Sequence, residues 1–209
     1  MSIETPTTPT RRRRRTPESA EREILEAAES FLAEHPFRDL SVDEVMARTT
    51  MSRPSFYVYF RDRNHLLGRL VEGIGSELFE GANVWLEGRG DMRESLGAVA
   101  AMYARHGLVL GAIADAAGHD PEAEATYRGL IERFIEATAK RIAQDVAAGH
   151  IEPLDATEAA RALVWMSERY LKETLGRLPR TPLETVVETL PEIWTRALYG
   201  FGRAASKRR

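Results

Sequence analysis

SVDEVMARTTMSRPSFYVYFRDR, residues 41–63, holds two short helical patterns that are separated by a polar turn. Ser41 is followed three residues later by Glu44, which is the capping-box pattern that starts a helix. The apolar side chains that follow lie on one side of a helix over residues 42–48. A first short helix is therefore expected at the beginning of this stretch.

A second short helix is expected over residues 53–60. Ser52 is its N-cap candidate, and Pro54 suits its first turn. Polar groups occupy one side of this helix, whereas Phe56 and Phe60 occupy the other. Two short helices joined by a tight turn, with the second exposing a polar face, predict a helix-turn-helix.

The second helix of such a motif enters the major groove of DNA, where base edges can be distinguished. Its N-terminal residues contact the bases, and here they are Arg53, Pro54 and Ser55. An arginine can donate two hydrogen bonds to guanine, which is worth roughly 1–3 kcal/mol of discrimination. The alternative is that the arginines form a solvated face without a partner.

Phosphate contacts are expected beside the base contacts. Tyr57 and Tyr59 offer hydroxyls, and Arg63 with the first amides of the next helix forms an anion site. The alternative is that both tyrosines are half-buried packing residues. The candidate DNA-binding residues are Ser41, Ser52, Arg53, Pro54, Ser55, Tyr57, Tyr59 and Arg63.

The remaining chain has amphipathic patterns of helical period and no useful stretch that alternates with period two. The predicted fold is therefore all-α, with about nine helices. Beyond the two short helices, they are expected over 17–35, 62–86, 92–105, 108–117, 121–148, 155–175 and 182–201.

Charge is distributed unevenly along the 209 residues, although the net charge is only −3. Residues 35–69 hold six arginines against four acids, whereas residues 70–202 hold thirteen Lys and Arg against twenty-one Asp and Glu. A polyanion is therefore expected to meet one end of the molecule only.

Four regions follow from these patterns. Residues 1–16 contain five consecutive arginines without a hydrophobic period, and we expect a disordered basic arm there. Residues 17–62 form the predicted helix-turn-helix domain. Residues 63–202 form a larger helical domain with an excess of acidic residues, and residues 203–209 form a basic tail. The arm either lies in a minor groove or adds non-specific charge.

Composition excludes several classes of protein. The chain has no cysteine, so disulfide scaffolds and thiolate metal sites are excluded. No segment approaches the roughly 20 apolar residues that span a bilayer, and no signal peptide is recognisable. A cytoplasmic protein without a membrane partner is expected.

Nothing in the sequence indicates an enzyme. The five histidines are scattered, and neither metal-ligand spacings nor a phosphate-binding loop occur. His119 and Asp120 precede Pro121 in an expected loop, which is most simply an ordinary turn. We therefore expect no catalytic residues, no metal and no cofactor.

From Ile24 to Leu70 the sequence resembles the DNA-binding domain of the TetR family of transcriptional regulators. The resemblance rests on ILEAAESFL, SVDEVMA and SRPSFYVYFRDRNHLL. It implies a homodimer that binds two half-sites one helical turn apart, with Tyr57, Tyr59 and Arg63 on phosphates. One departure is Thr50, where the family usually has glycine, which implies a strained or slightly different turn.

The segments LVWMSERYL and IWTRALYG look like the EthR-type subgroup of that family. The resemblance implies a long apolar effector pocket, and helical spacing independently puts residues 127, 131, 134 and 138 on one face. The alternative is that these side chains are plain core. The candidate effector-binding residues are Leu96, Val99, Tyr103, Tyr127, Ile131, Phe134, Thr138, Val164, Ser167, Leu171 and Trp194.

Dimerisation is expected through the last two helices, which are apolar on more than one face. The alternative is that both faces pack within one subunit. The apolar residues left over for a partner are Ala159, Ala160, Leu163, Met166, Val186, Val187, Leu190 and Leu198.

The predicted function is that of a transcriptional repressor. It binds a palindromic double-stranded DNA operator as a homodimer and is released by a small apolar or amphipathic effector. The alternative is a helical protein–protein interaction module without specific DNA binding. Steep salt dependence of duplex binding distinguishes the two.

Overall fold

A computed structural model of the chain describes residues 16–200. Within this range all regular elements are helical, which confirms the predicted all-α class. They are α1 (Pro17–Leu32), the 3-10 turn η1 (Phe37–Asp39), α2 (Val42–Ala47), α3 (Arg53–Tyr59), α4 (Arg63–Leu86), α5 (Met92–Ala117), α6 (Pro121–Ala147), α7 (Ala156–Leu175) and α8 (Leu183–Tyr199).

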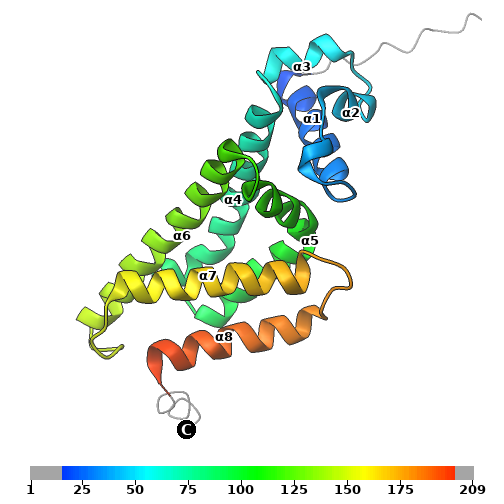
Figure 1. Cartoon of the computed structure of the whole chain (residues 1–209). Helices are drawn as coiled ribbons and strands as arrows, with labels where there is room; N and C mark the ends of the chain where they lie inside the picture. Colours follow the sequence, from blue (N-terminus) through cyan, green and yellow to red (C-terminus); the bar gives the residue numbers. More distant parts are fainter. Residues whose placement is uncertain (1–15, 201–209) are drawn as a thin grey trace, which may run out of the picture.

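The helices form a small head and a larger body (Figure 1). The head consists of α1, η1, α2 and α3, and α4 runs from the head into the body. In the body α4 packs against α5 and α6, whereas α7 and α8 lie side by side at the end away from the head. The predicted basic tail and all of the basic arm except Thr16 lie outside the described residues.

Side-chain caps start several helices, including the predicted cap at Ser41, whereas Ser52 stands at the N-cap of α3 without a side-chain capping bond. Ser41 Oγ accepts a hydrogen bond from the Glu44 amide at 3.2 Å, and Asp62 accepts one from the His65 amide at 2.8 Å. Thr16, which was assigned to the arm, caps α1 by accepting from the Ser19 amide at 3.3 Å. Such caps each stabilise a helix by about 1 kcal/mol.

The prediction of separate helices over 92–105 and 108–117 is wrong, because α5 is continuous through Gly107. A Cβ on Gly107 would lie 2.6 Å from the carbonyl oxygen of Leu175 at the end of α7. Gly111, one turn later, approaches Gly176 equally closely. These glycines therefore allow two helices to come close together, and they do not interrupt the helix.

The turn between α2 and α3 closes without a left-handed residue. Within residues 16–200 every positive φ belongs to glycine, so Thr50 is not strained in that way. Its amide and its hydroxyl donate to Glu23 Oε1 at 2.7 and 2.8 Å. The turn therefore differs from the glycine form and is tied to α1.

Helix α5 is long and apolar enough to cross a membrane by length and composition, unlike the expectation from sequence. It lies in the centre of the body and contacts α4, α6, α7 and α8. Its apolar side chains therefore contribute to the body's core. A continuous apolar core connects the body with the head, where Phe56 and Phe60 are fully buried.

Candidate effector cavity and DNA-binding surface

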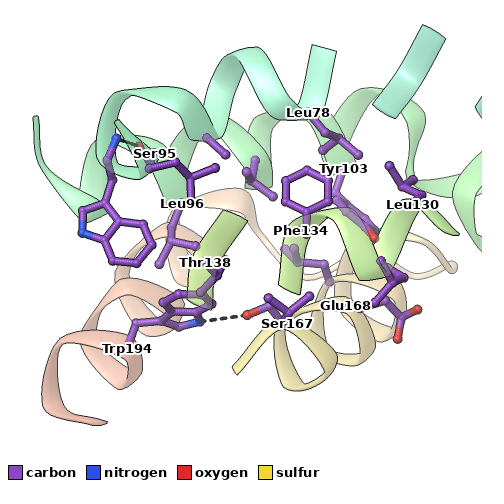
Figure 2. A pocket seen from close by; sticks show the side chains of 17 residues that line it. Leu78, Ser95, Leu96, Tyr103, Leu130, Phe134, Thr138, Ser167, Glu168 and Trp194 are labelled. Atoms are coloured by element: carbon purple, nitrogen blue, oxygen red, sulfur yellow. Dashed lines mark hydrogen bonds between the residues drawn. The ribbon is translucent and has the colours of Figure 1, made fainter. Parts of the chain in front are cut away.

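The body contains a cavity of about 80 Å³ between α4, α5, α6, α7 and α8 (Figure 2). All of the predicted effector-binding residues except Tyr127 line it, because their helical spacings turn them to the same interior. The lining residues are Leu78, Ala82, Trp85, Leu86, Ser95, Leu96, Val99, Tyr103, Leu130, Ile131, Phe134, Thr138, Val164, Ser167, Glu168, Leu171 and Trp194.

Most of the cavity wall is apolar, and several of its polar groups are already engaged. Trp194 Nε1 donates to Ser167 Oγ at 2.8 Å, and that hydroxyl donates to the Leu163 carbonyl at 2.7 Å. Ser95 Oγ accepts from the Trp85 amide at 2.9 Å. These bonds engage the two serine hydroxyls of the wall and hold two tryptophans beside the cavity.

The cavity is smaller in volume than a typical ligand site, which measures about 300–1,000 Å³. Phe134 contributes to this narrowness, because its ring stacks on Phe79 with centroids 3.9 Å apart. A ligand must therefore displace side chains or separate helices before it fits.

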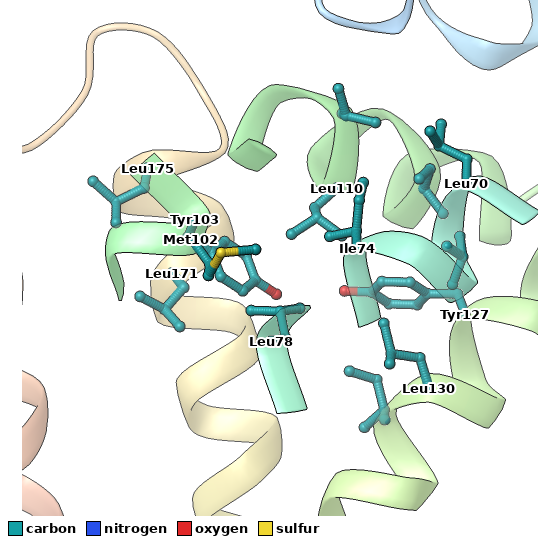
Figure 3. Packing of buried hydrophobic residues seen from close by; sticks show 14 of the residues in the cluster. Leu70, Ile74, Leu78, Met102, Tyr103, Leu110, Tyr127, Leu130, Leu171 and Leu175 are labelled. Atoms are coloured by element: carbon teal, nitrogen blue, oxygen red, sulfur yellow. The ribbon is translucent and has the colours of Figure 1, made fainter. Parts of the chain in front are cut away.

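Tyr127 was predicted to face the effector cavity, but it does not line it. Its hydroxyl donates to Glu168 Oε1 at 2.5 Å, and it lines a neighbouring pocket. Figure 3 shows the hydroxyls of Tyr103 and Tyr127 on either side of Leu78. Burial raises the pKa of the Tyr103 hydroxyl, and the nearby Glu168 charge raises it further. Burial also raises the pKa of Tyr127, with further contributions from Tyr103 and Glu168.

Sequence reasoning missed the contribution of α4 and the carboxylate of Glu168. Leu78 belongs to the apolar face of α4 that the sequence makes plain, but nothing in the sequence indicated that this face borders a cavity. Glu168 lies four residues after Val164 on the predicted stripe of α7. The helical period therefore places Glu168 on the cavity-facing side, but a charged residue was not expected in an apolar wall.

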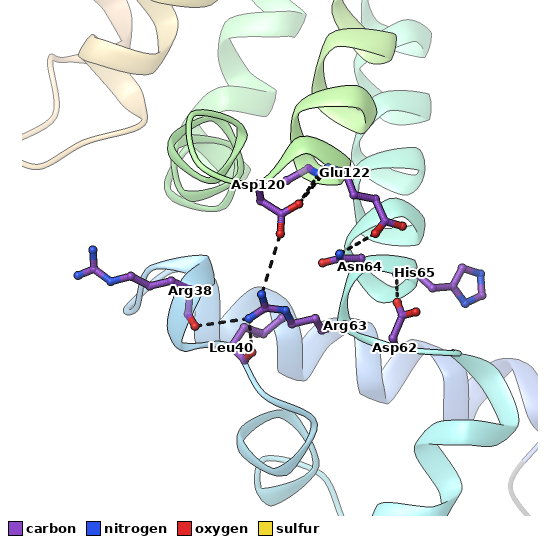
Figure 4. Close-up of polar contacts among 9 residues, drawn as sticks. Arg38, Leu40, Asp62, Arg63, Asn64, His65, Asp120 and Glu122 are labelled. Carbon is purple, nitrogen blue, oxygen red and sulfur yellow. Dashed lines mark hydrogen bonds and ion pairs between the residues drawn. The ribbon is translucent and has the colours of Figure 1, made fainter.

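The head and the body meet at a joint around Arg63 (Figure 4). Its guanidinium lies over the Phe37 ring at 5.0 Å from the centroid and donates to the Leu40 carbonyl at 3.4 Å. It also lies 4.0 Å from Asp120 Oδ2 at the start of α6. The structure therefore directs Arg63 toward this joint and separates it from the exposed face of α3.

Further polar contacts join neighbouring helices of the head and the body. No pattern in the sequence predicted them. Asn64 Nδ2 donates to Glu122 Oε2 at 2.7 Å, which links α4 to α6. The Nδ1 atom of His106 on α5 lies 2.8 Å from Glu29 Oε1 on α1. The orientation of the head thus depends on the positions of α5 and α6 in the body.

One face of α3 points outward. Arg53 and Tyr57 are one turn apart on it, with 57% and 53% of their surface exposed, and Pro54 and Val58 are their exposed neighbours. Phe56 on the opposite face is buried in the head. The helix therefore presents a ridge that is free to enter a groove.

Arg53 is paired within the head. Its Nε atom lies 2.7 Å from Asp43 Oδ1 on α2, and its guanidinium lies 5.9 Å from the centre of the Tyr57 ring. Exposed ion pairs of this kind contribute only about 0–1 kcal/mol. Arg53 can therefore exchange Asp43 for an acceptor on DNA at little cost in stability.

The remaining predicted DNA-binding residues lie around this ridge. Ser52 and Ser55 are at the start of α3, with their hydroxyl oxygens 3.1 Å apart. Ser41, which caps α2, is exposed. Tyr59 is half-buried against the core of the head, as the packing alternative predicted.

Known families match both parts of the chain. Residues 24–70 match the model described as bacterial regulatory proteins, tetR family, and residues 92–200 match the C-terminal domain of the transcriptional regulator EthR. The chain belongs to the TetR family. More narrowly, it is an EthR-like regulator, as the resemblance implied.

Relatives of this TetR-family chain cover nearly its full length. The HTH-type transcriptional regulator EthR of Mycobacterium tuberculosis is 29% identical over 205 residues, with 93% of this chain and 95% of the relative covered. The EthR of Mycolicibacterium smegmatis is 28% identical over 202 residues, covering 92% and 93%. A TetR-family structure from Syntrophomonas wolfei has a TM-score of 0.74 at 16% identity, covering 87% and 96%.

Family membership makes the chain a transcriptional regulator with an N-terminal DNA-binding domain. Regulators of this family are not enzymes, which confirms the predicted class. They bind DNA operators and typically act as dimers.

Five of the eight residues that were predicted for the dimer surface do not lie on the outer faces of α7 and α8 in this TetR-family chain. The residues Ala160, Leu163, Val186, Leu190 and Leu198 are buried within one subunit, as the packing alternative held. Apolar side chains that stay partly or fully accessible on these helices include Ala159, Trp165, Met166, Val187 and Ile193.

Proposed function

We propose that this chain is a ligand-responsive repressor in the cytoplasm, which binds a palindromic operator as a homodimer and is released by a small apolar effector. The observation that carries the proposal is the combination of two features in one molecule. The ridge of Arg53 and Tyr57 suits a DNA groove, and the apolar cavity in the body suits a small molecule.

Helices α4 and α6 connect the two features. Helix α4 begins at Arg63 in the joint and lines the cavity with Leu78 and Trp85. Helix α6 begins beside Asp120 in the joint and lines the cavity with Phe134. A ligand that widens the cavity separates these helices, and the Arg63–Asp120 and Asn64–Glu122 contacts transmit the shift to the head.

Such a shift weakens operator binding through geometry. Two heads of a dimer must place their α3 helices roughly 34–36 Å apart to meet successive major grooves. The effector acts only to the extent that it binds the widened form more tightly than the closed form. The small volume of the closed cavity supports a large difference between those two affinities.

The dimer we propose uses the outer faces of α7 and α8. Trp165 and Met166 on α7 and Ile193 on α8 are the apolar groups available to a partner, with Ile193 exposing 41% of its surface. A two-fold axis pairs the same faces of both subunits. This end of the body is far from the head, which leaves both α3 helices accessible (Figure 1).

The test is a selection of bound duplexes from random DNA, followed by affinity measurements at several salt concentrations. We expect a two-fold symmetric operator and a steep fall of affinity with salt, because arginines displace counterions from phosphates. A protein–protein module without specific DNA binding would yield no enriched sequence and would contradict the proposal.

A further inference from the structure

The cavity wall contains a single carboxylate. Glu168 on α7 is 9% exposed, and it is the only Asp, Glu, Lys or Arg among the residues that line the cavity. It also lines a neighbouring pocket of about 260 Å³, so it stands in the partition between the two spaces. A ligand in the cavity therefore meets this carboxylate.

Nothing within residues 16–200 forms an ion pair with Glu168. The cations around it are held elsewhere: Lys172 lies 2.9 Å from Asp115, Arg128 lies 3.1 Å from Glu124, and Arg169 lies 3.2 Å from Glu173. The hydrogen bond from the Tyr127 hydroxyl is the contact that supports the carboxylate. The carboxylate thus has a neutral hydrogen-bond donor but no ion pair among the described residues, so a cationic ligand can add a charge-assisted hydrogen bond.

A second polar group lies away from Glu168 along the same wall. Thr138 is 2% exposed, and it contributes a hydroxyl group to the lining. Figure 2 shows Thr138 near Trp194, whereas Glu168 and Tyr103 lie toward the opposite end. The cavity thus has an anionic end, an apolar middle and a neutral hydroxyl.

We propose that the effector is an apolar molecule with one protonated amine, which binds the Glu168 carboxylate while the apolar part occupies the cavity. This inference rests on the proposed function and specifies its ligand class. An amine donates charge-assisted hydrogen bonds to the carboxylate, whereas a fatty acid places a second negative charge beside it.

The test compares hexylamine, hexan-1-ol and hexanoate, which share one apolar chain. Trp85 and Trp194 line the cavity, so their fluorescence reports binding. We expect hexylamine to bind roughly tenfold to a hundredfold more tightly than hexan-1-ol, as a charged hydrogen bond allows, and hexanoate to bind most weakly. Release of the operator is measured with the same three compounds.

Two variants assign the preference to one carboxylate. Glu168→Gln should remove the advantage of hexylamine over hexan-1-ol. Glu173→Gln, an exposed position on the same helix, should keep it. The comparison of the three ligands on the unmodified protein needs no variant. It therefore tests the preference for an amine even if Glu168→Gln does not fold.

The possible failures are distinguishable. If hexan-1-ol binds and releases the operator as well as hexylamine does, the amine proposal is wrong and the proposed function stands. An amine preference that survives Glu168→Gln also overturns it. If none of the three binds, the amine proposal fails together with the effector part of the proposed function, whereas operator binding is judged separately.

Discussion

The head and the body hold their candidate binding residues in opposite environments. On α3, Arg53 and Tyr57 are more than half exposed, so the head meets DNA as it stands. In the body, Thr138 and Glu168 are buried around a cavity of about 80 Å³. The proposed DNA-binding surface is therefore preformed, whereas the proposed effector site must widen to hold a ligand.

This difference gives the joint between them its importance. Arg63 and Asn64 in the joint contact Asp120 and Glu122 of α6 through exposed or half-exposed polar groups. Such contacts are weak enough to change with the body. Opening of the cavity can therefore alter the head without unfolding either part.

The largest expected effect concerns the core that the two parts share. Phe56→Ala removes a fully buried ring from the head, and we expect a loss of about 3–5 kcal/mol in the free energy of unfolding. Urea denaturation followed by circular dichroism measures it. Val58→Ala, at an exposed position two residues later, is the control and should change stability by less than about 0.5 kcal/mol. Equal losses for both variants would contradict the assigned faces of α3.

Loss of the base contact should have the next largest effect. Arg53→Ala should weaken binding to the selected operator by roughly 1–3 kcal/mol and flatten the preference among sequences. Fluorescence anisotropy with operator and scrambled duplexes measures both. Arg161→Ala, an exposed arginine on α7, should leave them unchanged. A preference that stays intact in Arg53→Ala would remove this residue from base reading.

The buried tyrosines of the body predict a loss of stability at high pH. The pKa values of Tyr103 and Tyr127 are raised in the folded chain, whereas tyrosines of the unfolded chain ionise near about pH 10. The stability from burying the neutral phenols is therefore complete below about pH 10 and is lost as the pH rises toward the folded values.

Denaturation at a series of alkaline pH values checks this expectation. The variant in which both Tyr103 and Tyr127 are replaced by Phe should show a shallower loss, because it lacks the two phenols. An identical pH dependence in the variant and the unmodified protein would show that other groups cause the loss.

The smallest expected effect lies in the joint. Asp120→Asn should change stability by at most about 1 kcal/mol, since the Arg63 contact is long and partly exposed. It should nevertheless reduce the difference in operator affinity between ligand-bound and ligand-free protein. Asp91→Asn, which alters the cap of α5 at the other end of the body, controls for a general loss of acidic caps.

Local chemistry made the head predictable. Ser41 and Asp62 cap helices whose positions the sequence indicated, and Phe56 and Phe60 turn inward as their spacing requires. The cavity wall followed for the same reason, because helical period determines which residues share a face.

Contacts between distant segments were not predictable. Gly107 looked like a break because its packing partner, Leu175, is far away in sequence. Arg63 stays a predicted phosphate ligand, but its contact with Asp120 was not predictable, because the two residues are far apart in sequence. Tyr127 shares a face with Ile131, but the rotation of α6 directs it to Glu168 instead. The helical period determines which residues share one face of a helix. The packing of whole helices determines which residues that face contacts.

The most direct test is a single linkage experiment on head and body. Operator affinity is measured with and without the tightest-binding hexyl compound, and affinity for that compound is measured with and without operator. Reciprocal coupling requires both affinities to fall by the same factor, expected to be about 5–150-fold. Operator affinity that is unchanged at saturating ligand would show that the cavity and the DNA-binding surface are independent.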